Sequence, residues 1–180
     1  VTNTYTLNFA YGNGIAVDGA GFLLNNEMDD FSAKPGSANG YGLIGGTANA
    51  VEPYKRPLSS MTPTIVFNAN NKPTLAYGSP GGSTIITIVL QMILNSIEFD
   101  MGIAEATSAA RIHHQWLPDR VFYEKGISVD SLRLLKSMGH DISTSSRVLG
   151  STQSIATNGQ YLVGSADPRR QGAAAIPQGN

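Results

Sequence analysis

The stretch Ser79-Pro80-Gly81-Gly82-Ser83 decides the fold, because it joins a short apolar strand expected over residues 74–77 to a long apolar helix expected over residues 83–99. Two glycines at a helix start leave backbone N–H groups uncovered, and the positive end of the helix dipole lies at the same point. A negative oxygen, on a phosphate or on a tetrahedral intermediate, would be held there without any charged side chain. The alternative is a plain strand-to-helix turn, in which the glycines only redirect the chain.

The length and composition are those of a globular protein. With 180 residues, 41% of them hydrophobic and 14% charged, the chain can build a real core, and we expect a single domain over residues 1–180. A net charge of -1 without a long basic run argues against nucleic acid as the main partner. The absence of cysteine excludes thiolate nucleophiles, cysteine-bound zinc and disulfides, and it is compatible with reducing and oxidising compartments alike. No apolar stretch is long enough to span a bilayer, so no membrane span is expected.

Strands, then buried helices, then strands again are expected along the chain, which favours an α+β layered sandwich. The strands are expected over residues 4–9, 22–24, 64–67, 74–77, 120–124, 141–144, 154–156 and 161–164. The helices are expected over residues 83–99, 103–110 and 129–138, with Gly139 ending the last one. Residues 85–97 are apolar on nearly every side, so we expect the first helix to be packed on both faces. Residues 32–53 lack a sustained period and predict a long irregular loop.

Polar residues gather at the expected strand ends and in the adjoining loops. Glu27 and Asp30 stand three residues apart and could face one cation, such as an ammonium or a metal; the alternative is a solvated acidic turn in which Asp30 caps a short helix. Ser59 and Ser60 could offer two hydroxyl donors to a carboxylate or phosphate, or could form an ordinary turn before the next strand. We expect one pocket to be formed by Asn8, Glu27, Asp30, Ser59, Ser60 and the Gly81-Gly82 turn.

The adjacent pair His113-His114, followed by Gln115 and Trp116, could indicate a metal ligand set or a general base. Neighbouring residues of a strand point to opposite faces, so the two imidazoles cannot easily share one ion, and no third ligand lies at a suggestive spacing. We therefore expect a packing role for these histidines, and neither a metal nor a cofactor. A dinucleotide fingerprint is also absent, because Gly12-Asn13-Gly14 lacks the third glycine and the following helix.

Taken together, several runs closely resemble the small subunit of the γ-glutamyltranspeptidase family. In order along nearly the whole chain they are Thr6-Leu7-Asn8, residues 23–31, 55–61, 78–83, 113–118 and 150–153, and Asp167-Pro168-Arg169. The resemblance implies an N-terminal nucleophile (Ntn) hydrolase with a four-layer αββα sandwich, made by autocatalytic cleavage of a precursor. This chain would supply part of that sandwich, and a large subunit from the same precursor would complete it as a heterodimer.

The resemblance also implies a chemistry. An N-terminal Thr, with its own α-amino group as base, attacks the γ-glutamyl amide of glutathione or a related donor, and the acyl group then passes to water or to an amino acid or peptide acceptor. This nucleophile would precede Val1 and so is not in this sequence. Bacterial members are periplasmic or secreted, and the same location is expected here.

Roles for individual residues follow from the same resemblance, by position. It implies Gly81 and Gly82 as the oxyanion hole, Thr6 as a hydrogen-bond partner of the nucleophile, Ser59 and Ser60 as donors to the substrate α-carboxylate, Asn8, Glu27 and Asp30 as partners of its α-ammonium, and Tyr41 as part of a lid over the pocket. A glutamyl head group is a zwitterion, so a site with hydroxyl donors at one end and carboxylates at the other suits it.

Other functions stay open at this point. Within the same fold, the chain could belong to a cephalosporin or glutaryl acylase or to a poly-γ-glutamate depolymerase. Loss of the ammonium-binding carboxylates would favour the acylase, and both Glu27 and Asp30 are present. A function of a different class is that of a catalytically inert fragment or binding subunit, which the missing nucleophile suggests.

Overall fold

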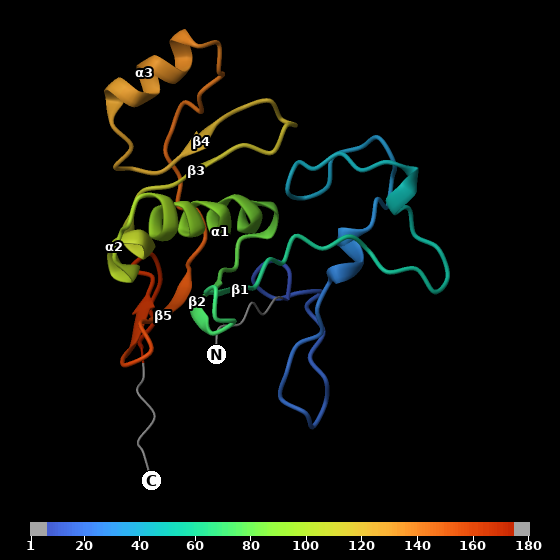
Figure 1. The fold of residues 1–180 in the computed structure, drawn as a ribbon. Helices are drawn as coiled ribbons and strands as arrows, with labels where there is room; N and C mark the ends of the chain where they lie inside the picture. Colours follow the sequence, from blue (N-terminus) through green and yellow to red (C-terminus); the bar gives the residue numbers. More distant parts are fainter. Residues whose placement is uncertain (1–6, 175–180) are drawn as a thin grey trace.

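A computed structural model describes residues 7–174 of the chain (Figure 1). Four strands form one antiparallel sheet in the spatial order β1-β2-β5-β6; they are β1 (Thr64–Phe67), β2 (Pro73–Gly78), β5 (Gln153–Thr157) and β6 (Leu162–Ala166). The predicted hairpin is confirmed, with Thr64 opposite Tyr77 and an irregularity between Val66 and Phe67. The two predicted strands near the C-terminal end are confirmed as well, each within two residues of its expected bounds.

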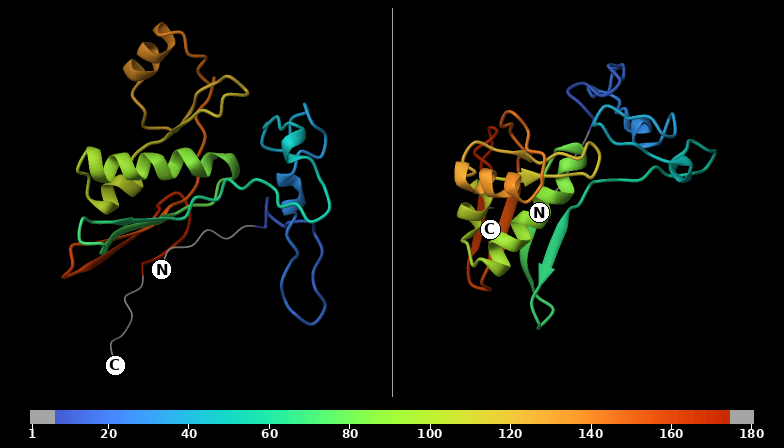
Figure 2. Two further views of the ribbon diagram at one scale, coloured as in Figure 1. Left: turned by 45° about the vertical axis from the view of Figure 1, so that its right-hand side comes forward. Right: turned by 90° about the horizontal axis from the view of Figure 1, so that it is seen from above.

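The helix α1 (Ile85–Ile93) crosses one face of this sheet, as the left view of Figure 2 shows. A 3₁₀ turn (Gly82–Thr84) precedes it and a π-helical turn (Leu94–Glu98) continues it, so the predicted helix over 83–99 is confirmed with altered winding at both ends. Between helix and sheet lies a core built from Tyr77, Ile85, Val89 and Met92 with Ile103 and Ala106 of α2 (Ile103–Ser108). In residues 7–174 no helix has both the length and the apolar character needed to cross a membrane.

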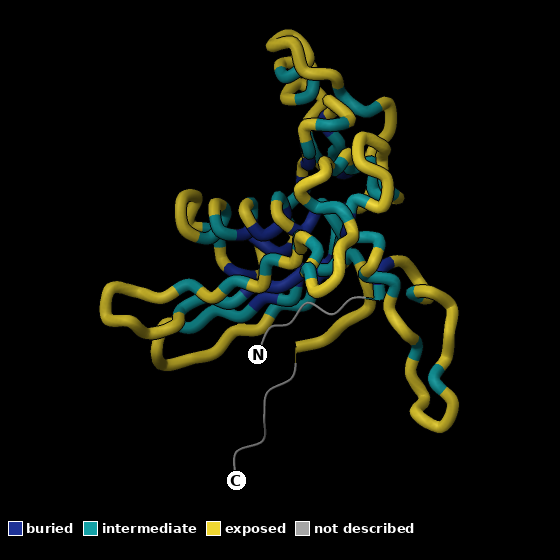
Figure 3. Tube along the Cα trace, turned by 90° about the vertical axis from the view of Figure 1, so that its right-hand side faces the viewer, coloured by how far each residue is buried: buried dark blue, intermediate teal, exposed yellow. Residues whose placement is uncertain are grey.

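The expectation that the long helix is packed on both faces is wrong within this chain. Its outward face is exposed, at 52% for Ile86, 51% for Leu90 and 55% for Ile97. The far face of the sheet is exposed too, at 57% for Ile65 and 53% for Phe67. Much of the buried chain lies between helix and sheet (Figure 3), although residues such as Phe31 and Val121 are buried elsewhere. The physical reason is that the chain folds as one helix layer on one sheet, so each layer has a single covered face.

A second small unit stands above α1 in Figure 1. It consists of the two-stranded sheet β3 (Ile112–His113) and β4 (Phe122–Tyr123), followed by α3 (Val129–Ser137). Ser128 begins that helix by accepting a hydrogen bond from Ser131 N at 3.0 Å, which confirms the predicted helix. The strand expected over 141–144 is reduced to a single bridge between Val121 and Ile142.

The N-terminal strands are wrong where the structure describes them. Asn8 and Phe9 have φ values of 55° and 59°, which no strand residue adopts, and residues 22–24 contribute one bridge, between Leu23 and Ala16. Among the described residues, 7–9 and 22–24 belong to no sheet, so the period-two alternation there does not form a ladder. The irregular loop over 32–53 is confirmed, with one short 3₁₀ turn (Thr47–Asn49).

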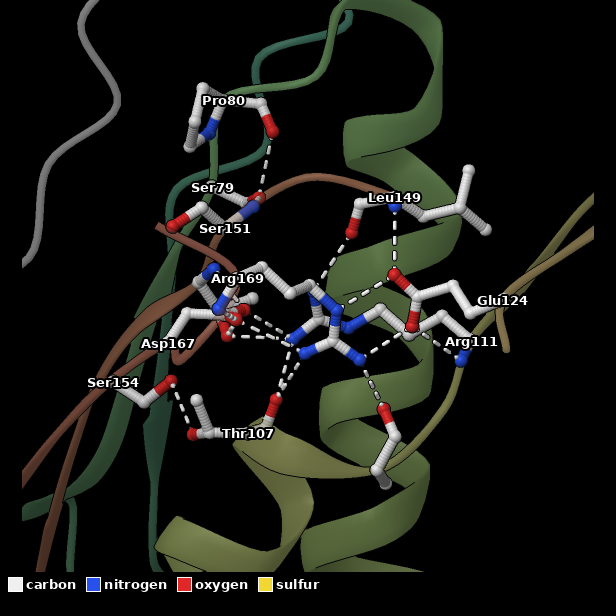
Figure 4. A network of polar contacts seen from close by, with 12 residues as sticks. Ser79, Pro80, Thr107, Arg111, Glu124, Leu149, Ser151, Ser154, Asp167 and Arg169 are labelled. Atoms are coloured by element: carbon white, nitrogen blue, oxygen red, sulfur yellow. Dashed lines mark hydrogen bonds and ion pairs between the residues drawn. The ribbon is translucent and has the colours of Figure 1, made fainter. Parts of the chain in front are cut away.

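A buried ionic network links the C-terminal segment to the centre of the molecule (Figure 4). Arg111 and Asp167, each 1% exposed, form a salt bridge at 2.7 Å between Nη2 and Oδ2. Arg169 donates to Glu124 at 2.5 Å, and Arg111 also donates to Leu149 O at 2.8 Å. Burial alone would raise the pKa of Asp167, but the hydrogen bond from Arg169 N and the charge of Arg111 outweigh it and hold the pKa below its ordinary value.

Candidate functional site

A cavity of about 780 Å³ lies where the N-terminal loops meet the start of α1. Seven of the candidate residues line it, from five separate stretches of the sequence: Asn8, Glu27 and Asp30, Tyr41, Ser60, and Gly81 and Gly82. The convergence expected from the sequence is therefore present for these seven. Ser59 is not among the lining residues; its side chain is exposed and accepts a hydrogen bond from Met61 N at 3.2 Å. Thr6 falls outside the described residues.

The glycine turn at the helix start needs its glycines. Gly81 has φ 148° and Gly82 has φ 55°, both in the region that L side chains rarely adopt. A Cβ on Gly81 would lie 2.5 Å from Thr84 Oγ1, and that hydroxyl donates to Gly81 O at 2.8 Å. The turn thus brings backbone without a side chain to the cavity wall at the positive end of α1. The N–H groups of Thr84 and Ile85 are bonded within the 3₁₀ turn, to Gly81 O and Gly82 O, so the glycine N–H groups are the candidate donors to a ligand. This arrangement suits an oxyanion.

Another part of the cavity lining is acidic. Glu27 and Asp30 stand on one 3₁₀ turn (Glu27–Asp30), whose backbone is held by Asn49 Nδ2 donating to Asp30 O at 2.7 Å. Desolvation by burial, a hydrogen bond with Glu27 and the charges of Glu27 and Asp29 raise the pKa of Asp30 to about 6. Within the described part of the chain, Glu27 Oε1 is buried and has no hydrogen-bond partner. A bound cation would relieve both groups, because it pairs with the lone carboxylate oxygen and favours ionised Asp30.

Tyr41 closes the cavity over the glycine turn. Its hydroxyl donates to Asn8 Oδ1, and its ring stacks on Phe9 with centroids 5.0 Å apart. The loop that carries it is shaped by Asn39, whose Oδ1 accepts hydrogen bonds from Tyr41 N and Leu43 N, each at 3.0 Å. Burial, and after it the negative charge of Asp30, raises the pKa of the Tyr41 phenol. The hydroxyl therefore stays a donor and keeps the loop tied to Asn8.

Ser60 connects the segment before β1 to the Gly81-Gly82 turn. Its Oγ donates to Gly82 O at 3.1 Å, and Thr62 Oγ1 donates back to Ser60 O at 2.8 Å. Ser60 lines the cavity, while the adjacent Ser59 belongs to a local turn. The structure thus gives the two serines different surroundings, a difference that the sequence alone could not show.

The histidine pair divides as its strand position predicts. His113 is buried, with Nδ1 at 2.7 Å from Thr87 Oγ1 and Nε2 at 2.9 Å from Gln115 Oε1, whereas His114 reaches outward to Asp119 at 3.0 Å. In residues 7–174 no three His, Asp or Glu side chains are grouped so as to hold a metal ion.

Two cationic residues that the sequence analysis did not single out also line the cavity, Lys34 and Arg170. Lys34 lies in the irregular loop, where no periodicity gives its direction. Arg170 directly follows Asp167-Pro168-Arg169, so that motif was the one available signal for it.

The α+β fold is that of the N-terminal nucleophile hydrolases. The structure matches the gamma-glutamyltranspeptidase of Pseudomonas nitroreducens in complex with L-DON with a TM-score of 0.90 at 44% identity, covering 99% of this chain and 93% of that chain. It matches the enzyme of Helicobacter pylori with a TM-score of 0.88 at 55% identity, covering 94% of this chain and 93% of that one. The predicted α+β Ntn-hydrolase fold class is therefore confirmed.

The chain belongs to the gamma-glutamyltranspeptidase family, whose model matches residues 1–176. It is 57% identical over 170 residues to the glutathione hydrolase proenzyme of Escherichia coli, covering 94% of this chain and 29% of that protein. It is 45% identical over 179 residues to the glutathione hydrolase proenzyme of Pseudomonas aeruginosa, covering 98% of this chain and 32% of that protein. The chain thus spans less than a third of the length of these curated relatives.

Proposed function

We propose that this chain is the small-subunit part of an enzyme that cleaves the γ-glutamyl amide of glutathione or related donors and transfers the glutamyl group to water or to an amino acid or peptide. One observation carries the proposal: the Gly81-Gly82 turn and the Glu27–Asp30 carboxylates line the same cavity. An oxyanion subsite and an ammonium subsite in one cavity fit a substrate whose scissile amide and α-ammonium belong to one glutamyl group.

The chemistry would begin with an N-terminal Thr upstream of Val1. Its hydroxyl oxygen bonds to the γ-carbonyl carbon while its α-amino group takes the hydroxyl proton, and the resulting oxyanion is stabilised by the N–H groups of the Gly81-Gly82 turn. The carbon–nitrogen bond then breaks, and the departing amine takes the proton. An acyl-enzyme ester remains, and water or an acceptor amine attacks it to release the glutamyl product and restore the threonine.

Substrate orientation would come from the two ends of the cavity. Glu27 and ionised Asp30 attract the α-ammonium, supported by the buried, unpaired Glu27 Oε1. Ser60 lines the cavity, and its hydroxyl can donate to the α-carboxylate once it turns away from Gly82 O, whereas Ser59 is exposed outside the lining and would have to move toward the cavity to join in. Tyr41 covers the glycine turn and limits the access of water, which affects the ratio of hydrolysis to transfer.

A large subunit from the same precursor is the proposed partner. The relatives named above are proenzymes of which this chain covers about 30%. The apolar outer face of α1 and the far face of the sheet support the proposal, because faces of this size are normally covered by another layer of structure. Covering both would complete the four-layer αββα sandwich. We also propose a periplasmic or secreted location, which cell fractionation of the native source would test.

The acylase alternative has less support. The structure matches a cephalosporin acylase from Bacillus halodurans with a TM-score of 0.82 at 25% identity. An acyl donor without an α-amino group would leave the half-buried Glu27 and Asp30 at the cavity wall with no cation to pair with, which is costly for the buried Oε1 of Glu27. The γ-glutamyl donor uses both carboxylates and is therefore preferred.

The full proenzyme, expressed so that both subunits form, tests the proposal with a γ-glutamyl anilide. We expect release of the aniline, and faster release when an acceptor dipeptide is added. Two folded, associated subunits without any release would overturn the enzymatic function and favour an inert binding subunit. Release from a glutaryl anilide as fast as from the γ-glutamyl anilide would favour the acylase.

A further inference from the structure

Gln115 lies between the loop that carries Tyr41 and the start of α1. Its Nε2 donates to Tyr41 O at 3.0 Å and to Leu117 O at 3.1 Å. Its Oε1 accepts from Ser83 Oγ at 2.8 Å and lies 2.9 Å from His113 Nε2. Both amide protons and the carbonyl oxygen are therefore engaged, and they join segments 74 and 32 residues away in the sequence.

The backbone carbonyls of Tyr41 and Leu117 determine the direction of every hydrogen bond that Gln115 makes. Carbonyl oxygens only accept, so the amide nitrogen must face Tyr41 and Leu117, and the amide oxygen must face Ser83 and His113. His113 then carries its proton on Nε2, and its Nδ1 is an acceptor 2.7 Å from Thr87 Oγ1, whose single proton is shared between this nitrogen and Thr84 O at 3.0 Å. Burial lowers the pKa of His113 and so favours this neutral ring, although its hydrogen bond to Gln115 acts in the opposite sense. The network is thus polar, directional and fully satisfied around Gln115.

Tyr41 and the residues around Ser83, which Gln115 joins, are also in contact with each other at the cavity. Ser83 directly follows Gly82, and the ring of Tyr41 lies on Gly82, so that a Cβ there would come within 2.7 Å of Tyr41 Cζ. Gln115 holds the backbone of Tyr41, whereas Asn8 and Phe9 hold its side chain. The ring is therefore held above the glycine turn through its side chain and through its backbone, and Gln115 is the backbone attachment that ties the Tyr41 loop to Ser83 and His113.

We propose that Gln115 is a positioning residue that fixes the Tyr41 loop over the glycine turn and thereby sets how tightly the γ-glutamyl donor is held and how much water reaches the acyl-enzyme. This inference rests on the proposed function and deepens it. Gln115 touches no reacting atom; it acts through Tyr41 and Ser83. Its removal should raise KM for the donor more than it lowers kcat, since the oxyanion turn itself stays intact.

The test uses the full, matured two-subunit enzyme and three variants. Gln115→Leu removes the donor and the acceptor, while Gln115→Glu keeps the acceptor for Ser83 and removes the donor to Tyr41 O. For both variants we expect KM for the γ-glutamyl anilide to rise roughly 3- to 10-fold, which is the effect of losing one ordinary net hydrogen bond. Faster hydrogen exchange of residues 39–43 and a larger share of hydrolysis over transfer should accompany the rise.

Gln91→Leu is the matched control. Gln91 makes the same kind of contacts, with Nε2 donating to Thr87 O at 2.7 Å and to Ile112 O at 2.8 Å and Oε1 accepting from Ile112 N at 3.0 Å. It joins α1 to β3 but contacts neither Tyr41 nor Ser83. We expect KM and the exchange of residues 39–43 to match those of the unmodified enzyme in this variant.

Three results would overturn the inference. Equal changes in the Gln91 and Gln115 variants would make Gln115 a structural residue only. An unchanged KM in Gln115→Leu would remove it from the control of the lid, and a Gln115→Glu variant that behaves as unmodified enzyme would show that the tie to Tyr41 O is dispensable. If the unmodified enzyme itself releases no aniline, the proposed function fails, and the exchange of residues 39–43 still decides whether Gln115 holds the loop.

Discussion

The ring of Tyr41 lies directly on Gly82, so the proposed lid and the proposed oxyanion turn are in contact. A Cβ added to Gly82 would stand 2.7 Å from Cζ and 2.8 Å from Cδ1 of this ring, and Gly82 has φ 55°. A side chain here must push the lid away or reshape the turn, and the left-handed backbone adds a cost of about 1–2 kcal/mol for an ordinary residue.

We therefore expect Gly82→Ala to lower kcat/KM for a γ-glutamyl anilide by at least about tenfold, the factor that about 1.4 kcal/mol produces. Gly46→Ala is the control, because Gly46 has φ -97° and nothing lies within 4 Å of the position that an added methyl group would take. Steady-state kinetics of both variants check the prediction. Full activity of Gly82→Ala would mean that the turn and the lid do not shape the reacting site.

Asp30 should give the enzyme a pH dependence in donor binding. Its pKa is raised to about 6 by burial and by Glu27 and Asp29, and only the ionised form attracts an ammonium. As the pH rises from 5 to 7, Asp30 loses its proton, and we expect kcat/KM for a γ-glutamyl donor to rise through a pKa near 6. In Asp30→Asn this rise of kcat/KM should vanish, while any pH dependence due to the nucleophilic amine stays. A rise through the same pKa in Asp30→Asn would assign that pKa to another group.

A second test of Asp30 uses donors with and without the α-amino group. Asp30→Ala should weaken a γ-glutamyl donor far more than a glutaryl donor, since only the first loses an ion pair. The expected difference is about 10- to 100-fold in kcat/KM, which corresponds to a charge-assisted hydrogen bond of roughly 1.5–3 kcal/mol. Equal losses with both donors would indicate that Asp30 only supports the 3₁₀ turn.

Local patterns predicted those parts of the fold whose neighbours are close in sequence. The hairpin of β1 and β2 and the helix α3 with its Ser128 cap depend on contacts within about a dozen residues, and both are confirmed. The strand expected through Asn8 failed because alternation predicts a strand only where a partner strand exists, and here the backbone turns left-handed. The prediction that α1 is buried on both faces was wrong because the sequence does not show how many layers of the fold this chain itself supplies.

The sequence could predict which residues line the site, but not the hydrogen bonds and ion pairs that connect them. The seven cavity-lining candidates are polar or glycine residues at segment ends, which the sequence indicates. The role of Gln115 depends on partners 32 and 74 residues away, and no spacing reveals such contacts. The same holds for the Arg111–Asp167 bridge, whose members lie 56 residues apart.

That bridge should dominate the stability of the C-terminal segment. Asp167→Asn leaves the guanidinium of Arg111 buried without its counter-charge, and breaking a buried pair in this way costs about 3–5 kcal/mol. Asp130→Asn breaks the exposed pair with Arg133 and should cost no more than about 0.5 kcal/mol. Urea unfolding of the assembled enzyme checks both variants. Similar midpoints for the two would show that the buried pair contributes no more than a surface one.

The outer face of α1 should be a contact with the large subunit. Leu90 is 51% exposed on that face next to Ile86, and a lysine there would be buried without a partner if another layer covers it. We expect Leu90→Lys to weaken the association of the two subunits, so that they separate on size-exclusion chromatography at concentrations where the unmodified pair stays together. Leu90→Met keeps the face apolar at similar volume and should pair normally. Intact pairing of Leu90→Lys would leave this face open to solvent in the assembled enzyme and would place the partner on the far face of the sheet alone.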